Sequence, residues 1–224
     1  MWATARKPAE VAQLRAEGFV AVQLDVNDRL EVDQLSARIK QNGKGLDILI
    51  NNAGYGAMGP VLDAGVEGIK LQFETNVFSV VSGVLVTPFA GAYCASKAAV
   101  HALSDALRME LAPFGIRVME VQPGAIDTSF AKNASAQVEH LIAEDSPWWP
   151  MREGIRARAH ASQDNPTPVS ELTDAVFQAT QKTKPPALLR HGNGSRAMPL
   201  LASLVPRALL QKILMKRFGL NTSL

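Results

Sequence analysis

Residues 91–111 read GAYCASKAAVHALSDALRMEL, and the rest of the chain is organised around this stretch. Apolar side chains recur in it at every third or fourth position, which predicts a single amphipathic helix with an apolar stripe along one side. The members of that stripe are Val100, Leu103, Leu107 and Leu111.

Tyr93 and Lys97 lie four residues apart in this helix, so their side chains project from one face. A phenol has an ordinary pKa near ~10, and an adjacent ammonium group stabilises the phenolate. We therefore expect Lys97 to lower the pKa of Tyr93, which would act as a general acid and base, and to hold a polar ligand such as a ribose. The alternative is an ordinary surface pair, and the spacing alone does not exclude it.

Towards the N-terminus, short β-rich runs alternate with segments of helical length. Residues 46–50 are apolar throughout, which is typical of a strand buried on both faces of a parallel sheet. The alternation predicts an α/β fold with a doubly wound parallel sheet, whose ligands bind beyond the carboxyl ends of the strands. The predicted strands are 2–4, 19–26 and 46–50, and the predicted helices are 8–17 and 29–41.

Towards the C-terminus we expect further helices at 61–81 and 169–183 and strands at 116–121 and 187–189. Asn76 lies inside the first of these helices, where an amide competes for backbone hydrogen bonds, so we expect it to bind water or a neighbouring carbonyl. Residues 129–168 show no clean period and would either cover a binding site or vary freely.

Polar residues at the predicted strand ends are the candidate ligand contacts. Asp25 follows one strand, and Asn52, Ala53 and Gly54 follow the next. Gly54 would let the backbone approach a ligand closely, and Asn52 offers both donors and an acceptor. An ordinary Asn-Gly turn explains the same residues equally well. Thr128, after the strand at 116–121, would donate to a carboxamide.

Composition excludes several classes of function. A net charge of +2, with no basic cluster among aromatic residues, argues against a nucleic-acid partner. Four scattered histidines and one cysteine give no metal-ligand spacing. The single cysteine, the absence of an apolar leader and the absence of a long apolar run predict a cytoplasmic protein.

Several short motifs together resemble the short-chain dehydrogenase/reductase family, in the order in which that family carries them. Within the family the chain looks most like bacterial relatives of the steroid and retinol dehydrogenases. The resemblance covers nearly the whole chain up to Thr128 and is looser beyond it. The motifs are Leu24-Asp25-Val26, Asn51-Asn52-Ala53-Gly54, Asn76-Val77, Tyr93-Cys94-Ala95-Ser96-Lys97 and Pro123-Gly124.

The resemblance implies hydride transfer between a nicotinamide cofactor and a ketone or secondary alcohol of a small apolar substrate. Tyr93 would exchange a proton with the substrate oxygen, Lys97 would lower its pKa and bind the nicotinamide ribose, and Asn76 would support a proton relay through water. The cofactor contacts would be Asp25 and Val26 at the adenine, Asn52, Ala53 and Gly54 on the adenosine side, and Pro123, Gly124, Ile126 and Thr128 at the nicotinamide.

The resemblance also favours NADP(H) over NAD(H). Arg6 stands where the family places its phosphate-binding basic residues, and no acidic residue follows it to bind a free ribose 2′-hydroxyl. The family also suggests a homo-oligomer that shares the helix at 91–111 and its neighbour.

Two departures from the family pattern predict an incomplete three-layer Rossmann-like fold. The family opens with a strand and a glycine-rich turn, and we expect about one βα unit of this kind to be missing before Met1. Val80 occupies the position of the family's catalytic Ser, with Ser79 and Ser82 on either side, so we expect an interior strand to have been excised near Val81.

We expect a dinucleotide-binding and catalytic domain over residues 1–190, with the substrate loop at 129–168, and a basic amphipathic tail at 191–224 broken by Pro206. The tail would pack on its own domain or a sister subunit, or contact a membrane surface weakly. Missing strands would leave the backbone hydrogen-bonding groups of their neighbours unpaired, so we expect the chain to fold poorly and to bind dinucleotide weakly. A truncated, catalytically silent relative is therefore the alternative to an active oxidoreductase.

Overall fold

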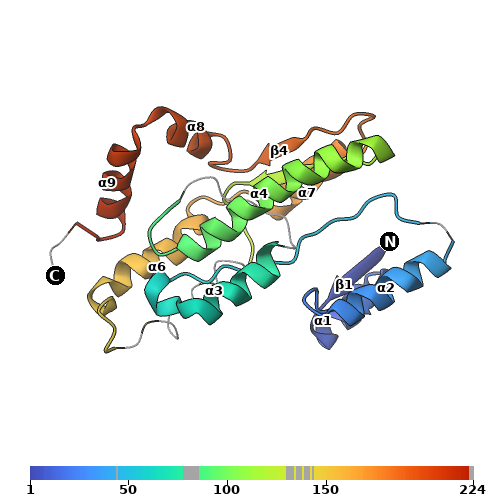
Figure 1. Cartoon of the computed structure of the whole chain (residues 1–224), viewed down its shortest axis with the longest axis horizontal. Helices are drawn as coiled ribbons and strands as arrows, with labels where there is room; N and C mark the ends of the chain where they lie inside the picture. The colour runs from blue at the N-terminus through green and yellow to red at the C-terminus, as the bar shows by residue number, and fades with distance from the viewer. Residues whose placement is uncertain are drawn as a thin grey trace. The chain divides into compact units, whose positions relative to one another are not determined.

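The computed structural model describes residues 1–43, 45–77, 86–129, 134, 138, 142 and 144–221. The chain divides into two compact units, Met1–Asn51 and Asn52–Leu224 (Figure 1). Ser79, Val80, Val81 and Ser82, on which the predicted loss of a catalytic strand depends, lie outside the described residues.

The first unit is a strand-helix-strand-helix run, as the sequence predicts. Its two strands pair in parallel, with Trp2 opposite Val20. Asp28 begins the second helix, because its carboxylate accepts hydrogen bonds from the backbone N–H groups of Leu30 and Glu31 at 2.9 and 3.1 Å. Arg38 lies on the second helix, and its guanidinium is 5.2 Å from the ring centroid of Trp2. The elements are β1 (Trp2–Ala5), α1 (Pro8–Ala16), β2 (Val20–Gln23) and α2 (Arg29–Gln41).

The prediction of a buried strand at 46–50 is wrong. These residues form no strand, and Leu46, Ile48, Leu49 and Ile50 are 51%, 52%, 71% and 67% exposed. An apolar run becomes a central strand only where other strands bond to both its edges and helices cover both faces. In the part of the chain that the structure describes, the sheets are the pairs β1–β2 and β3–β4, and neither includes this run.

In the second unit, α4 spans Gly91–Leu111, the helix that the sequence predicts, and α3 (Val61–Val77) packs along it (Figure 1). The buried face of α4 differs from the predicted stripe. Val100 is 1% exposed, but Leu103 and Leu107 are 46% and 44% exposed. The neighbouring elements instead cover the turns that present Cys94, Ser96, Lys97 and Ser104.

The second parallel pair is β3 (Glu120–Pro123) and β4 (Leu188–His191), with Glu120 opposite Leu188. The sequence predicts the first of these strands from residue 116, but pairing begins only where β4 begins. The single doubly wound sheet is thus present as two short parallel pieces, and the α/β class and the parallel direction are confirmed.

The core of the second unit is an apolar cluster under the region predicted to be irregular. That region contains the helix α6 (Arg152–His160), which the sequence analysis missed. Ile155 and Ala159 of α6 lie in the cluster and are 0% and 2% exposed. The Trp148 ring meets Phe89 edge to face, with centroids 6.3 Å apart. The cluster comprises Met58, Phe89, Ala90, Cys94, Ala134, Val138, Ile142, Met151, Ile155, Ala159 and Phe218, with Tyr93, Trp148, Trp149, Leu214 and Leu220 packed against it.

The part of the chain that the structure describes also contains α7 (Val169–Thr180), α8 (Ala197–Leu204) and α9 (Arg207–Arg217), with short 3-10 turns at Ala112–Phe114, Trp149–Met151 and Ala161–Gln163. The helix predicted at 169–183 and the break at Pro206 are confirmed. Among the described residues, no helix has the length and apolar character needed to span a bilayer.

Candidate active site

The first turns of α4 bring Tyr93 and Lys97 together, as their spacing predicts. The Nζ atom of Lys97 lies 5.7 Å from the centroid of the Tyr93 ring. Lys97 is only 3% exposed, and Tyr93 packs against the apolar cluster of the second unit. A phenol and an amine therefore share a largely desolvated region.

The electrostatics of this pair differ from the prediction. Burial raises the pKa of Tyr93 to about 12, the positive charge of Arg158 opposes that rise, and Cys94 adds to it. Burial lowers the pKa of Lys97 to about 8. Lys97 does not lower the pKa of Tyr93 here, because the same desolvation that disfavours the phenolate also disfavours the ammonium.

Arg158 is the charged neighbour that the sequence analysis missed. It lies on α6, donates from Nε to the Thr87 hydroxyl at 2.5 Å, and hydrogen-bonds the Cys94 side chain. Burial lowers its own pKa. The available signal was the pair Ile155 and Ala159, whose spacing of four marks one buried helix face.

Asn76, fully buried on α3, joins the loop at Tyr55 to α4. Its Oδ1 accepts from the Tyr55 backbone N–H at 2.9 Å, and its Nδ2 donates to the Tyr55 carbonyl at 2.8 Å and to the Ser96 hydroxyl at 3.2 Å. The Ser96 hydroxyl in turn donates to the Tyr93 carbonyl at 2.8 Å. Of the two uses expected for Asn76, the bond to a neighbouring carbonyl is the one observed. These bonds occupy both amide hydrogens, so a water would have to bind at Oδ1.

Asn52, Ala53 and Gly54 form an irregular segment that leads into Tyr55. Asn52 and Gly54 are exposed, and Ala53 is half-buried. Because Asn76 bonds both backbone groups of Tyr55, the end of this segment is fixed relative to α3 and α4.

The predicted nicotinamide loop follows β3 and is held by the loop after β4. Gly124 donates from its backbone N–H to the His191 carbonyl at 2.8 Å, and a Cβ atom on Gly124 would lie 1.9 Å from the Asn193 carbonyl oxygen. Only glycine fits there. Pro123 ends the strand, Ile126 is buried and Thr128 is exposed.

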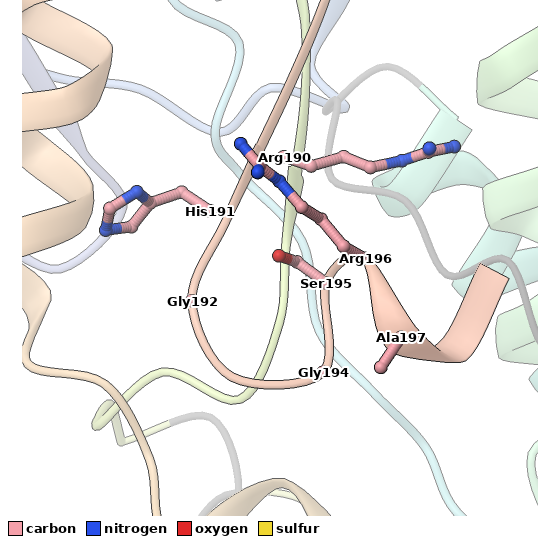
Figure 2. A pocket seen from close by; sticks show the side chains of 7 residues that line it. All are labelled: Arg190, His191, Gly192, Gly194, Ser195, Arg196 and Ala197. Atoms are coloured by element: carbon pink, nitrogen blue, oxygen red, sulfur yellow. The ribbon is translucent and has the colours of Figure 1, made fainter. Parts of the chain in front are cut away.

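An open hollow of about 350 Å³ lies beyond the carboxyl end of β4 (Figure 2). The side chains of Arg190 and His191 leave the strand in opposite directions, and Arg196 reaches across the loop. The lining residues are Arg190, His191, Gly192, Gly194, Ser195, Arg196 and Ala197.

Within the first unit, Arg6 and Asp25 lie at the carboxyl ends of the neighbouring strands β1 and β2. The Gln23 side chain donates to the Arg6 carbonyl at 3.2 Å, and Asp25 accepts from the Asn27 backbone N–H at 3.0 Å. Val26 follows in the same turn, half-buried. Arg6, Asp25 and Val26 thus belong to the first unit, and the other predicted contacts belong to the second.

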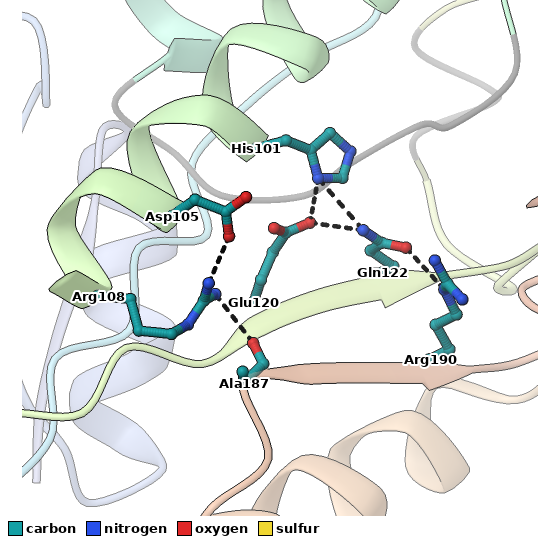
Figure 3. Close-up of polar contacts among 7 residues, drawn as sticks. All are labelled: His101, Asp105, Arg108, Glu120, Gln122, Ala187 and Arg190. Carbon is teal, nitrogen blue, oxygen red and sulfur yellow. Dashed lines mark hydrogen bonds and ion pairs between the residues drawn. The ribbon is translucent and has the colours of Figure 1, made fainter.

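A buried polar network that the sequence analysis also missed fixes α4 to the second sheet (Figure 3). Glu120, 4% exposed, lies 2.5 Å from Nδ1 of His101 and accepts from the Gln122 amide at 2.8 Å. Arg190 donates from Nε to Oε1 of Gln122 at 2.9 Å. The helix that bears Tyr93 is therefore held to both strands through side chains.

Comparison with known proteins decides the family. The short chain dehydrogenase model matches residues 2–88 and 81–139. This chain belongs to the short-chain dehydrogenase family. The two matched segments overlap at residues 81–88, where the sequence predicts an internal loss.

Its relatives in this family include an uncharacterized oxidoreductase, YbbO, from Escherichia coli, which is 30% identical over 93% of this chain and 82% of that protein. The NADPH-dependent 1-acyldihydroxyacetone phosphate reductase of Saccharomyces cerevisiae is 28% identical over 99% of this chain and 83% of its own length. That alignment runs over 254 positions against 224 residues, so at least 30 positions have no residue here.

The fold also matches a solved structure of a short-chain dehydrogenase from Burkholderia cenocepacia in complex with NADP. The TM-score is 0.68 with 24% identity, over 99% of this chain and 86% of that chain. The Rossmann-like α/β class predicted for the chain is confirmed by this similarity.

Proposed function

We propose that this short-chain dehydrogenase is an NADP(H)-dependent oxidoreductase that interconverts a ketone and a secondary alcohol in an apolar substrate. The observation that carries the proposal is the buried Tyr93–Lys97 pair on α4, with Nζ 5.7 Å from the phenol ring. The apolar cluster against which Tyr93 packs supports an apolar substrate, because it offers hydrocarbon contacts beside the phenol.

Tyr93 would donate its proton to the carbonyl oxygen during reduction and accept it back during oxidation. A pKa of about 12 keeps the phenol protonated at neutral pH, which suits the donating role. Arg158 assists the reverse direction, because its charge favours the phenolate. Asn76 would contribute through a water at Oδ1, and Lys97 would hydrogen-bond the nicotinamide ribose.

In the first unit, the ends of the two strands carry residues suited to the adenosine half of the cofactor. Arg6 and Lys7 directly follow β1, where a ribose 2′-phosphate would bind, and Asp25 and Val26 follow β2 beside them. The nicotinamide would be held by the loop of Pro123, Gly124, Ile126 and Thr128. When bound, NADP(H) would supply or accept the hydride. The Saccharomyces relative is NADPH-dependent and the Burkholderia structure holds NADP, which supports the same choice here.

Two finer expectations accompany this proposal. The exposed leucines of α4, Leu103 and Leu107, support a homo-oligomer in which copies of this helix pack together. The single cysteine supports a cytoplasmic, reducing location.

A catalytically silent relative is the second candidate. The exposed apolar run at 46–50 and the broken family match at 81–88 favour it, because both point to an incomplete nucleotide-binding sheet.

The test is NADPH-dependent reduction of apolar ketones of increasing chain length, with the unaltered chain and with Tyr93→Phe. We expect turnover that rises with chain length and falls at least about 100-fold in Tyr93→Phe. NADPH fluorescence is measured in parallel. Turnover that survives Tyr93→Phe would contradict the assigned role, and absence of both binding and turnover would favour the silent relative.

A further inference from the structure

The charges of this chain are divided unevenly along its length. Asp174 is the last acidic residue, and eight of the 23 lysines and arginines follow it. Residues 175–224 therefore carry a formal charge of +8, whereas residues 1–174 carry 15 basic and 21 acidic groups, a charge of −6. An asymmetry of this size indicates a partner of negative charge at the C-terminal end.

The helices in this basic segment expose apolar side chains. On α8, Leu200, Leu201 and Leu204 are 59%, 43% and 72% exposed, and on α9, Leu209 and Ile213 are both 51% exposed. The two helices lie at one end of the second unit (Figure 1). Lys212 and Lys216 are exposed on α9 beside its apolar residues.

These apolar side chains are not exposed because the end of the chain is frayed. The opposite side of α9 is anchored in the second unit. Leu210 and Phe218 are 8% and 3% exposed, and Phe218 belongs to the apolar cluster. Gly154 of α6 approaches the Phe218 backbone so closely that a Cβ atom would lie 2.0 Å from its carbonyl oxygen. Arg217 pairs with Asp164 at 3.3 Å. The helix is thus fixed with one face in the core and the other outward.

We propose that α8 and α9 form a docking surface for an anionic lipid bilayer. The exposed leucines and Ile213 would enter the acyl boundary, and Arg207, Lys212 and Lys216 would contact lipid phosphates, the arrangement of an interfacial amphipathic segment. A second copy docked through the same surface would bring the four basic residues of α9, Arg207, Lys212, Lys216 and Arg217, against the same four of its partner, and of these Arg217 pairs with Asp164. The charge therefore favours lipid over self-association.

Docking does not depend on catalysis, but it would have a consequence for the proposed reaction. Phe218 and Leu214 pack in the same apolar cluster as Tyr93. A bilayer bound at α9 would place the membrane next to the helix that closes this cluster, so an apolar substrate could transfer from lipid. That consequence rests on the proposed function; the docking itself does not.

The test is co-sedimentation of the whole chain with phosphatidylcholine vesicles that contain or lack phosphatidylglycerol. We expect binding to the anionic vesicles only, and weaker binding as salt is raised. Lys212→Gln with Lys216→Gln should weaken partitioning about fivefold per lysine, on the order of 20-fold together. Leu204→Ser with Leu209→Ser should weaken it at every salt concentration.

The matched control is Lys40→Gln with Arg117→Gln, which removes the same charge from exposed sites elsewhere and should leave binding unchanged. Circular dichroism confirms that each variant keeps its fold. Absence of vesicle binding, or equal loss in the control, would overturn the proposal. So would lipid-free self-association that Leu204→Ser with Leu209→Ser abolishes, because it would identify a second copy as the occupant. NADPH turnover plays no part in this readout, so the proposed function can fail independently.

Discussion

Nδ2 of Asn76 on α3 donates to the Ser96 hydroxyl on α4 at 3.2 Å, and the same amide bonds both backbone groups of Tyr55. One buried side chain thus holds together the helix of Tyr93, its neighbouring helix and the loop that follows Gly54. Besides the proton relay that the resemblance implies, its bonds in this structure give Asn76 a positioning role.

Asn76→Ala should therefore lower the free energy of unfolding by about 1–3 kcal/mol, because it leaves the Tyr55 N–H without its partner and leaves the Tyr55 carbonyl with only the Gln72 amide, at 3.4 Å. Urea unfolding measures the change. Gln178→Ala, at an exposed position on α7, is the control and should change stability by less than about 0.5 kcal/mol. Equal effects at the two positions would refute the positioning role.

Stability should depend on alkaline pH through Lys97 and Tyr93, with opposite signs. The folded pKa of Lys97, about 8, is below its ordinary 10.5, so its contribution to stability is complete above pH 10.5 and is lost as the pH falls to about 8. The folded pKa of Tyr93, about 12, is above its ordinary 10.0, so its contribution is complete below pH 10.0 and is lost as the pH rises to about 12.

As the pH is lowered from 10 to 8, the free energy of unfolding of Lys97→Met should therefore rise by about 1–3 kcal/mol relative to that of the unaltered chain. Above pH 10.0, Tyr93→Phe should lose less stability than the unaltered chain. Urea unfolding across this range provides the measurement. Parallel curves for Lys97→Met and the unaltered chain would show that Lys97 is charged throughout.

Gly124→Ala should separate the end of β3 from the loop after β4. The added methyl group would overlap the Asn193 carbonyl, and the strain should cost about 1–3 kcal/mol. Gly68→Ala is the matched control, because its Cβ would make only an ordinary 3.7 Å contact with Ala64 within α3. That control should stabilise the chain by about 0.5–1 kcal/mol. If Gly124→Ala left the free energy of unfolding unchanged, the loop at Asn193 would have moved to accept the added methyl group.

His101→Leu should destabilise the chain by about 1–3 kcal/mol, because it removes one of the two hydrogen-bond partners of the buried carboxylate of Glu120 and leaves only the Gln122 amide. The double variant His101→Leu with Glu120→Leu should recover most of that loss, since it removes both polar groups. Asp105→Ala breaks the exposed pair with Arg108 and should cost less than about 1 kcal/mol. If the double variant is as unstable as the single one, the network is not what holds α4 to the sheet.

The helix at 91–111 and the Tyr93–Lys97 pair could be predicted because both depend only on residues close together in the sequence. Residues 91–111 form one helix because their spacing, their composition and the stop at Gly115 agree. Tyr93 and Lys97 share a face because helix geometry alone decides it.

The parts that depend on distant partners could not be predicted in this way. Residues 46–50 have the composition of a central strand, but a strand forms only where its neighbours pair with it. The pKa of Tyr93 depends on burial and on Arg158, which lies 65 residues further along the chain, on another helix. Glutamate is ordinarily a surface residue, and the contacts of Glu120 with His101 and Gln122 explain its buried place in the sheet.

The edge-to-face contact between Trp148 and Phe89, together with the stacking of Arg38 on Trp2, gives each unit its own optical reporter. The chain has three tryptophans, of which Trp2 belongs to the first unit and Trp148 and Trp149 to the second. Replacing either set with phenylalanine would let indole emission follow the denaturation of one unit while the other stays spectroscopically silent, and so reveal whether they melt together.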